Sequence, residues 1–479
     1  MVTAPVLAPE EPTPDWTKVP TRRELHESFD LWLDSLEEAV KEEPPSLEVL
    51  TRAVLAKRQE LTGQVTEALV RQRHAQALEQ KNATCPHCGR LLPARGLVSR
   101  TVETLVGEVT VERPYFYCLK CKQGFYPLDE ALELAERRKQ WDVQEAGAKL
   151  AAEVPFETAQ ELFSQLTGLS LSDHTAHEVV GEMGWGLGVL EVSPTAEEIA
   201  QRVAAVALGK KQPPIMVLAI DGAQVPTRPA GARGPGKGKK RHRARRARWQ
   251  GEWKEAKGFR FYLVDKERIV QVLSWHQVQT DEQLGKALRQ VKEAKLIPEE
   301  KVRLGIIGDG AKWIWNQARE LYPSAVQILD YYHLTERLHR VALAQFYDDP
   351  LKEREWVEAT KARLFYGYLE WVLLDLESMK PRDGEAAEEI RKLRGYLKEN
   401  QGRVKYGALR RKGYPIGSGG IESANKFISQ VRLKRSGAWW YVERANVMLA
   451  LRCAKYNGTF AKVFQLYKQR TTMGQGIHP

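Results

Sequence analysis

The feature that most constrains this fold is a change of hydrophobic period at about residue 213. From this point the apolar residues form short runs that are typical of buried strands, and helical segments separate the later runs. The expected strands are residues 215–220, 259–265, 268–276, 303–308 and 325–330, with helices at 281–294 and from 312. Three strands that can pair in sequence, followed by alternating helices and strands, predict a mixed α/β sheet.

Three acidic residues lie where these elements change from strand to turn or helix: Asp221, Asp309 and Glu422. In a sheet of the ribonuclease H type the first and fourth strands are neighbours, so we expect Asp221 and Asp309 to lie side by side. Glu422 follows Gly417-Ser-Gly-Gly420, which allows close backbone approach. Two Asp and one Glu on a rigid sheet suit Mg²⁺ or Mn²⁺, which take few protein oxygens and keep water and phosphate oxygens. The pattern therefore indicates phosphodiester chemistry.

Each of these carboxylates also has a purely structural interpretation. Asp221 could open an Asp-Gly turn, Asp309 could cap the helix that follows it, and Glu422 could complement a helix dipole. Their joint placement at the ends of neighbouring elements favours the metal site.

Four of the five cysteines form two Cys-x-x-Cys pairs, Cys85-Pro-His-Cys88 and Cys118-Leu-Lys-Cys121. Two such turns can present four thiolates to one tetrahedral ion, so we expect a structural Zn²⁺. Four free cysteines are the alternative. Cysteines in this pattern also argue for a reducing compartment.

The remaining cysteine and the one histidine of the first pair have simpler interpretations. Cys453 lies on an expected helix and is interpreted as a small core residue, and His87 is expected to point outward. Between the pairs, residues 99–117 alternate apolar and polar side chains around Gly107, which predicts a hairpin. Hairpin and cysteines together predict a zinc ribbon.

The order of these patterns predicts a multidomain chain with an interrupted core. Residues 140–186 predict three short helices with a turn at Gly168, either a helix-turn-helix or a generic helical bundle. The expected segments are a helical N-terminal region (1–80), a zinc ribbon (81–130), a helical, helix-turn-helix-like DNA-binding region (131–190), the first part of a ribonuclease H-like core (205–333), an all-α insertion (334–412), the final part of the core with the Glu422 helix (413–460) and a C-terminal tail (461–479).

The charge balance points to a polyanionic partner. A formal net charge of +11 makes nucleic acid the leading candidate. No run of about 18 apolar residues occurs, and the N-terminus lacks the pattern of a signal peptide. We therefore expect a cytoplasmic, nucleoid-associated protein with no membrane partner.

Several blocks of sequence, taken in order, carry a resemblance to a known family. They are Asp221-Gly-Ala, Gly308-Asp-Gly-Ala-Lys-Trp-Ile-Trp315, Ile328-Leu-Asp-Tyr-Tyr-His333 and Gly417-Ser-Gly-Gly-Ile-Glu-Ser423, joined by Trp253–Lys257 and Arg432–Gly437. In these blocks the chain resembles the DDE transposases of prokaryotic insertion sequences, in particular the ISKra group, which is related to the mutator-like transposases. The resemblance covers about residues 80–460, and the ordered combination is more specific than any one block.

The resemblance implies a catalytic triad of Asp221, Asp309 and Glu422 with Mg²⁺ or Mn²⁺ as cofactor. It also implies DNA as substrate, both the terminal inverted repeats of the element and the target, and a homodimer or higher oligomer on DNA. Asp330 and His333 resemble the Cys/Asp-x-x-His element of mutator-like relatives. They could orient DNA or the scissile phosphate, or they could be an N-cap aspartate and a buried histidine.

The chain departs from the family between Asp221 and Trp253, where a Gly/Lys/Arg tract runs from Arg228 to Arg248 without an acid. A solvated loop is one interpretation, but an uncompensated basic run favours contact with DNA. The expected DNA-binding side chains are Arg241, Arg243, Arg245, Arg246, Arg248, Arg432, Lys434 and Arg435.

These observations predict a DNA transposase that binds element ends, cleaves them and joins 3′-hydroxyl ends to target DNA. Two other functions stay open. One is a ribonuclease H-like nuclease without strand transfer, and the other is a domesticated DNA-binding regulator with an inert core.

Overall fold

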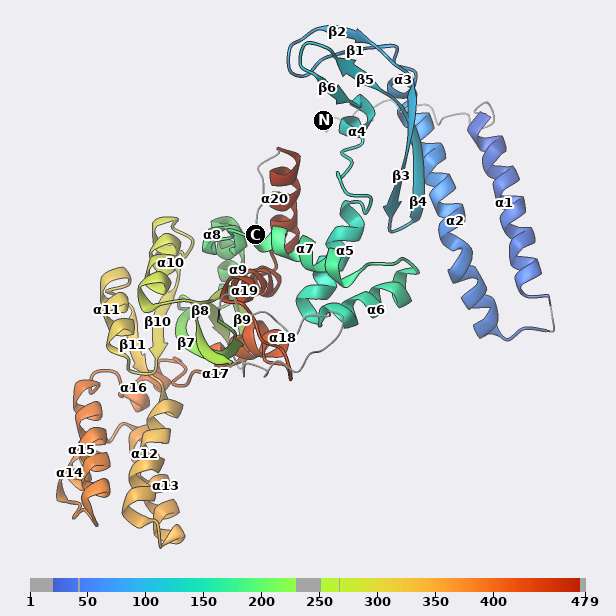
Figure 1. Ribbon diagram of the computed structural model, residues 1–479. Coiled ribbons are helices and arrows are strands. Elements are labelled where there is room, and N and C mark those ends of the chain that lie inside the picture. Colours follow the sequence, from blue (N-terminus) through green and yellow to red (C-terminus); the bar gives the residue numbers. More distant parts are fainter. Residues whose placement is uncertain (1–19, 42–43, 230–250, 267, 474–479) are drawn as a thin grey trace, which may run out of the picture. The chain divides into compact units, whose positions relative to one another are not determined.

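The computed structural model describes residues 20–41, 44–229, 251–266 and 268–473 (Figure 1). The chain divides into two compact units. The first contains Met1–Ala151 and Phe156–Val179, and the second contains Ala152–Pro155 and Val180–Pro479. The expected basic tract lies almost wholly at 230–250, outside the described residues.

The first unit combines helices with short antiparallel strand pairs. Its elements, of which α5 and α7 end in the second unit, are α1 (Pro20–Ala39), α2 (Leu47–Arg73), α3 (Ala75–Leu78), β1 (Asn82–Thr84), β2 (Leu91–Pro93), β3 (Leu97–Thr104), β4 (Gly107–Pro114), β5 (Phe116–Cys118), β6 (Gln123–Phe125), α4 (Pro127–Ala131), α5 (Trp141–Glu153), α6 (Phe156–Thr167) and α7 (Asp173–Gly184).

The β3–β4 hairpin is the centre of this unit. Its alternating pattern buries Val102, Val109 and Val111 together with Leu128 of α4. Helix α2 packs closely on β4, because a Cβ on Gly63 would lie 2.3 Å from the carbonyl oxygen of Glu108. The hairpin was predicted at 99–117, and the strands occupy 97–104 and 107–114.

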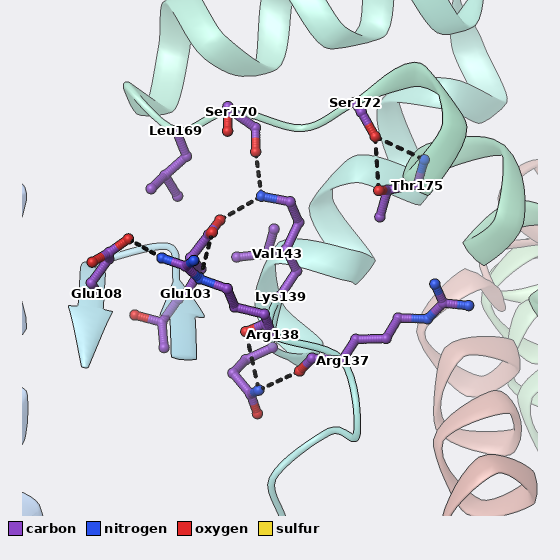
Figure 2. Close-up of polar contacts among 12 residues, drawn as sticks. Glu103, Glu108, Arg137, Arg138, Lys139, Val143, Leu169, Ser170, Ser172 and Thr175 are labelled. Carbon is purple, nitrogen blue, oxygen red and sulfur yellow. Dashed lines mark hydrogen bonds and ion pairs between the residues drawn. The ribbon is translucent and has the colours of Figure 1, made fainter. Parts of the chain in front are cut away.

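Charged side chains connect this hairpin to the helices that follow it (Figure 2). Glu103 on β3 accepts from Arg138 Nε at 3.0 Å and from the ammonium of Lys139. Lys139 also donates to the carbonyl of Ser170, in the turn between α6 and α7. The strand pairing itself extends to this segment, since Gln140 donates its backbone N–H to the carbonyl of Glu103 at 2.8 Å. The α6–α7 turn is therefore braced against the hairpin.

The second unit contains the main sheet, its covering helices and a helical insertion. Its elements are α8 (Val189–Val192), α9 (Ala196–Ala207), β7 (Ile215–Thr227), β8 (Glu252–Asp265), β9 (Arg268–Val278), α10 (Asp281–Glu293), η2 (Glu299–Lys301), β10 (Arg303–Gly308), α11 (Lys312–Leu321), β11 (Val326–Leu329), α12 (Tyr331–Phe346), α13 (Pro350–Tyr366), α14 (Leu369–Ser378), α15 (Gly384–Glu399), α16 (Tyr406–Arg411), α17 (Gly419–Ala424), the π-helical segment η3 (Asn425–Gln430), α18 (Val431–Leu433), α19 (Val442–Asn457) and α20 (Phe460–Thr472).

The five strands of the main sheet lie in the order β11-β10-β7-β8-β9. Strands β7, β8 and β9 pair antiparallel in sequence, whereas β10 and β11 run parallel to β7. The first and fourth strands, β7 and β10, are therefore neighbours, as the expected topology required.

The two faces of the sheet are covered by different helices, as the side chains of β8 show. Arg260 donates to the carbonyl of Gly420 and to Ser423 Oγ at 3.0 Å, so its face lies under α17. Phe261 points the other way and contacts Tyr322, next to α11, with ring centroids 6.1 Å apart. Because successive strand residues alternate between faces, the α17 face carries Gly258 and Arg260.

Helix α19 closes the free edge of the sheet along β9. Asn457 accepts from the backbone N–H of Ser274 at 2.7 Å and donates to its carbonyl at 3.0 Å. Asn446 does the same for Val278, at 2.8 and 3.2 Å. These two asparagines satisfy edge groups that would otherwise be open to pairing with another strand.

Several predicted boundaries differ from the structure, among them the start of β8, which was predicted at 259 and lies at Glu252. Strand β7 continues to Thr227, so Asp221 lies inside a strand rather than at its end or in a turn. Residues 222–227 contain Gly and Pro, which hid the strand, but they pair with β8 in full register. The helical insertion begins at Tyr331, and most of the predicted C-terminal tail is helix α20. None of the helices in the described part of the chain is long and apolar enough to cross a membrane.

Candidate functional site

Three aspartates and a histidine share one row across the main sheet. Asp221 on β7 is opposite Gly258 on β8, which is opposite His276 on β9. On the other side, Ile307 pairs with Ala219, and continuing this parallel register by two residues brings Asp309 opposite Asp221. Residues in one register row point to the same face. The row therefore lies on the face that α17 covers.

Asp330 extends the row by one strand, because Gly308 pairs with Leu329 and Asp330 donates its N–H to Gly308 at 2.9 Å. Its side chain is fully buried. Oδ1 accepts the backbone N–H of Tyr332 at 3.0 Å and that of Ser418 at 3.2 Å. Burial raises the pKa of Asp330, and the hydrogen bonds from Ser418 and Tyr332 lower it. Asp330 is thus the N-cap of α12, as the structural interpretation expected, and also holds the loop before α17.

His333 lies beside the buried Asp330. Its Nε2 is 3.6 Å from Asp330 Oδ2, which has no hydrogen-bond partner among the described residues. The imidazole keeps 35% of its side-chain surface exposed, so it is not the buried histidine of the structural interpretation. His333 can reach a ligand at the edge of the site.

Glu422 approaches this row from α17. Its Oε1 accepts from Ser418 Oγ at 2.5 Å, and Ser418 in turn donates its N–H to Asp330. Three residues later, Asn425 donates from Nδ2 to Asp221 Oδ2 at 2.8 Å. Because residues three apart share one side of a helix, Glu422 lies within a helical turn of the Asp221 contact. The structure thus brings all three predicted acids to one face.

The carboxylate of Asp221 has a raised pKa. Burial raises its pKa to about 6, and the charges of Asp309 and Asp330 add to the rise. The backbone N–H of Gly222 and the imidazole of His333 act in the opposite direction. Asp309 is more conventionally placed, with Oδ1 accepting the N–H of Ala311 at 2.9 Å. An acid that is desolvated and has like charges beside it is a candidate functional group.

The donor set of this face fits a hard divalent cation, with one qualification. Carboxylate oxygens predominate, and the unpartnered Oδ2 of Asp330 is buried within the cluster. However, in the described part of the chain only the cysteines form a group of three or more acidic, thiol or imidazole ligand atoms within 4.8 Å of one another. Glu422 is turned toward Ser418, and it would have to leave that hydroxyl to share an ion with Asp221 and Asp309.

The second candidate metal site is the cysteine cluster of the first unit. The Sγ atoms of four cysteines all lie within 4.8 Å of one another: Cys85, Cys88, Cys118 and Cys121. Each pair is presented by a tight strand pair, β1–β2 for the first and β5–β6 for the second. His87 is exposed, as expected, and does not belong to the cluster. Four thiols converging in this way match a closed tetrahedral zinc site.

Two thiols of this cluster, those of Cys118 and Cys121, have shifted pKa values. A hydrogen bond from the backbone of Cys121 lowers the pKa of Cys118 to about 6. The hydrogen bond with the Cys88 side chain is the main cause that raises the pKa of Cys121, to about 12. The charge of the Cys118 thiolate adds to the rise of the Cys121 pKa. Thiols must be deprotonated to bind a metal, so a divalent cation would offset the repulsion between them.

A cluster of aromatic and basic side chains lies where β7 ends and β8 begins. Trp253 is half-exposed, its ring centroid is 6.0 Å from that of Trp439, and Lys434 Nζ is 5.4 Å from it. Arg228 stacks on Tyr441 at 3.8 Å. This cation–aromatic surface, together with the exposed Arg435, can contact phosphates and bases.

The other expected DNA contacts are one buried arginine and five arginines that lie outside the described residues. Arg432 is buried, and its guanidinium lies 5.1 Å from the ring of Trp440, so we omit it from the interface. The five arginines outside the described residues are Arg241, Arg243, Arg245, Arg246 and Arg248.

Helices α6 and α7 flank the turn predicted at Gly168, which lies in the left-handed region at φ 77°. The sequence of α7 is Asp-His-Thr-Ala-His-Glu-Val-Val-Gly-Glu-Met-Gly, which contains no lysine or arginine. Phosphate contacts by a recognition helix depend on such side chains. A helical bundle explains α7 equally well.

Asn425 and Ser418 were not found from the sequence. Ser418 lies in the glycine-rich block that was noted for its backbone, and Asn425 is an amide in a helical pattern. Neither residue type carries a distinctive local signal. Their distance from Glu422 was the one feature of the sequence that could have indicated them, since both lie within four residues of it.

Comparison with known proteins assigns a family but no activity. The model described as "Uncharacterised protein family (UPF0236)" matches residues 46–470. The chain belongs to this family. Its match includes both the cysteine cluster and the carboxylate row. No curated protein matches the chain.

One solved structure with similarity is the "Drosophila P element transposase strand transfer complex". It is 11% identical, with a TM-score of 0.24, and the match covers 71% of this chain and 82% of that one. Similarity at this level carries no argument about the fold or function of the UPF0236 chain.

We predict one tightly bound Zn²⁺ per chain. Cys85→Ser should lose the ion and unfold the strand pairs around it, because binding and local folding are coupled. Elemental analysis combined with hydrogen exchange measures both effects. His87→Ala, in the same turn but outside the cluster, should keep a full zinc content. Wild-type protein without zinc would contradict the assignment.

We predict that Asp221→Asn is more stable than the wild type at pH 8 without added Mg²⁺ or Mn²⁺. A pKa raised from 3.8 to about 6 means that the neutral form favours folding below about pH 4 and that this contribution is lost as the pH rises through 6. Asparagine stays neutral at every pH, so the variant keeps this contribution to the free energy of unfolding at pH 8. The difference is at most about 3 kcal/mol. Urea unfolding at pH 8 and at pH 4 tests this, and the two proteins should differ only at pH 8. Equal stability at both values would show that the carboxylate is well solvated.

Proposed function

We propose that the chain is a DNA transposase of an insertion sequence, which cleaves element ends and transfers their 3′-hydroxyl strands to target DNA. The observation that carries this proposal is the row of Asp330, Asp309 and Asp221 across neighbouring strands, faced by Glu422. The resemblance to DDE transposases supports the same reading, and we propose that the sheet is of the ribonuclease H type.

In this proposal Asp221, Asp309 and Glu422 bind the cation, and Asp330 supports them from inside the protein. Mg²⁺ or Mn²⁺, when bound, would supply Lewis-acid stabilisation of the phosphoryl group during in-line displacement. Asp330 holds the Ser418 loop, which fixes the entry of α17. Glu422 moves from Ser418 Oγ toward the aspartates, and His333 contacts the phosphate at the rim.

We propose that the DNA backbone lies along the aromatic and basic surface at the ends of β7 and β8. Lys434, Arg435 and Arg228 supply positive charge there, and Trp253 offers a ring on which an unpaired base can stack. The basic tract begins directly after this surface in the sequence. We propose that the protein acts as a dimer or higher oligomer on paired element ends.

We predict that Asp221→Asn, Asp309→Asn and Glu422→Gln each abolish cleavage and strand transfer. Each change conserves shape and removes metal-binding charge, so zinc content and binding of terminal-repeat DNA should stay near wild type. A double variant should be about as inactive as a single one, because the residues act as a unit. Cleavage of labelled ends and joining of pre-cut ends measure the two steps separately.

The outcomes distinguish the competing functions. A ribonuclease H-like nuclease would cleave without joining pre-cut ends. A regulator would bind ends equally well with and without Mg²⁺ and release no product. Wild-type cleavage by one of the three variants would remove that residue from the triad.

We predict that replacing the five arginines of the basic tract with alanine weakens binding to all DNA sequences. The slope of log affinity against log salt should flatten by about one unit for each lost phosphate contact, because fewer counterions are released. The five positions are Arg241, Arg243, Arg245, Arg246 and Arg248. Fluorescence anisotropy over a salt series measures the slope. An unchanged slope would identify the tract as a solvated loop.

A further inference from the structure

Asn425 is a buried amide in contact with the triad that the proposed reaction leaves without a role. Its side chain is 3% exposed, and its Nδ2 donates to Asp221 Oδ2 at 2.8 Å. An ionised carboxylate has no proton to give, so the amide must present its N–H₂ group to Asp221. This hydrogen bond fixes one oxygen of Asp221, Oδ2.

The local backbone around Asn425 is unusual and has a visible cause. Residues 425–430 form a π-helical turn, in which the N–H of Val431 bonds the carbonyl of Lys426, five residues back. The carbonyls of Phe427 and Ile428 are taken by the guanidinium of Arg452, whose Nε is 2.9 and 3.1 Å from them. Such turns widen a helix by one residue and are frequent at functional sites. Here the turn begins at Asn425, three residues after Glu422.

Behind Asn425 lies a second buried polar group without a partner. His276 is completely buried, on the same register row as Asp221. It lies against the Asn425 side chain, and burial lowers its pKa to about 3, so the ring is neutral. Neither of its ring nitrogens, nor Asn425 Oδ1, has a hydrogen-bond partner among the described residues.

The space for this histidine is provided by a glycine between the two strands. Gly258 separates Asp221 from His276 in the row, and a Cβ there would lie 2.2 Å from His276 Cδ2. The imidazole thus occupies the room that a side chain at 258 would fill. A neutral imidazole carries one N–H donor, and Asn425 Oδ1 is the unpartnered acceptor beside it.

We infer that Asn425 is a positioning residue for Asp221, and that His276 orients the Asn425 amide. The His276 N–H directs Oδ1 toward itself, which turns Nδ2 toward Asp221 and fixes the carboxylate for the cation. The inference rests on the proposed function and deepens it, since it names outer partners of the metal-binding carboxylate. Outer-shell partners of this kind typically change metal affinity by about 10- to 100-fold.

The test measures Mn²⁺ binding to zinc-loaded protein without DNA, by the electron paramagnetic resonance signal of free Mn²⁺. Asn425→Leu keeps the branched shape but removes the amide, and its dissociation constant should rise at least about tenfold. His276→Phe keeps a ring without N–H and should weaken binding by a smaller factor. The control is Ser429→Ala, in the same π-helical turn, where a buried hydroxyl has no partner among the described residues. It should bind Mn²⁺ like the wild type.

Separate readouts keep a positioning role distinct from misfolding. Asn425→Leu should still unfold cooperatively on heating, and its binding of terminal-repeat DNA without metal should be near wild type. Removing the amide leaves the buried Asp221 carboxylate with one donor fewer, so some loss of stability is expected. If Asn425→Leu does not fold at all, the smaller Asn425→Ser, which is too short to reach Asp221, takes its place with the same expected loss of Mn²⁺ affinity.

Wild-type Mn²⁺ affinity in a folded Asn425 variant would overturn the role of Asn425, and wild-type affinity in His276→Phe would overturn that of His276. The proposed function fails in a different way. In that case wild-type protein would bind no Mn²⁺, or Asp221→Asn would bind it as tightly as wild type, and the inference would fall with it.

Discussion

The structure of the second unit depends on the cost of burying several carboxylates in one row. Like charges at the ends of neighbouring strands repel each other, and burial strengthens that repulsion. Most of the groups that offset this cost are neutral hydrogen-bond donors. Backbone N–H groups of Tyr332 and Ser418 bind Asp330, and the amide of Asn425 binds Asp221. Neutral donors lower the energy of the acids without cancelling the negative charge, so the cluster keeps its attraction for a cation.

One of these donors, Ser418, also positions Glu422, the acid that α17 carries. Ser418 bonds the buried Asp330 through its backbone and Glu422 through its hydroxyl, so the innermost and the outermost acids share one residue. From β8, Arg260 holds the first turn of α17 by its Gly420 carbonyl. The helix that carries Glu422 is short, and these hydrogen bonds add to the burial of Ile421 and Ala424 in holding it on the sheet. Rigid placement of the backbone thus leaves only the Glu422 side chain free to adjust.

Sequence reasoning predicted those parts of the structure whose signals are local. Apolar runs with period two marked the strands, and their order fixed the neighbourhood of Asp221 and Asp309. The two Cys-x-x-Cys pairs predicted the sulfur cluster, because thiols at that spacing have few other uses. The residues it missed depend on partners far away in the chain. The π-helical turn requires Arg452, the burial of Arg432 requires Trp440, and the second half of β7 exists because β8 pairs with it. No window of sequence around Asn425 contains Asp221 or His276, so its role could not be predicted from its neighbours.

The two candidate metal sites both gather groups that can carry negative charge, but they affect the folding energy in opposite ways. In the cysteine cluster, four thiols lie at the junction of short strand pairs that have little core of their own, so an ion there supplies folding energy. In the carboxylate row, a five-stranded sheet with covering helices supplies the folding energy, and the acids subtract from it. An ion at the first site can therefore be closed off from solvent. Under the proposed function, an ion at the second site would have to exchange with substrate oxygens, and Glu422 and His333 lie at the more exposed edge of the row while Asp330 and His276 are buried.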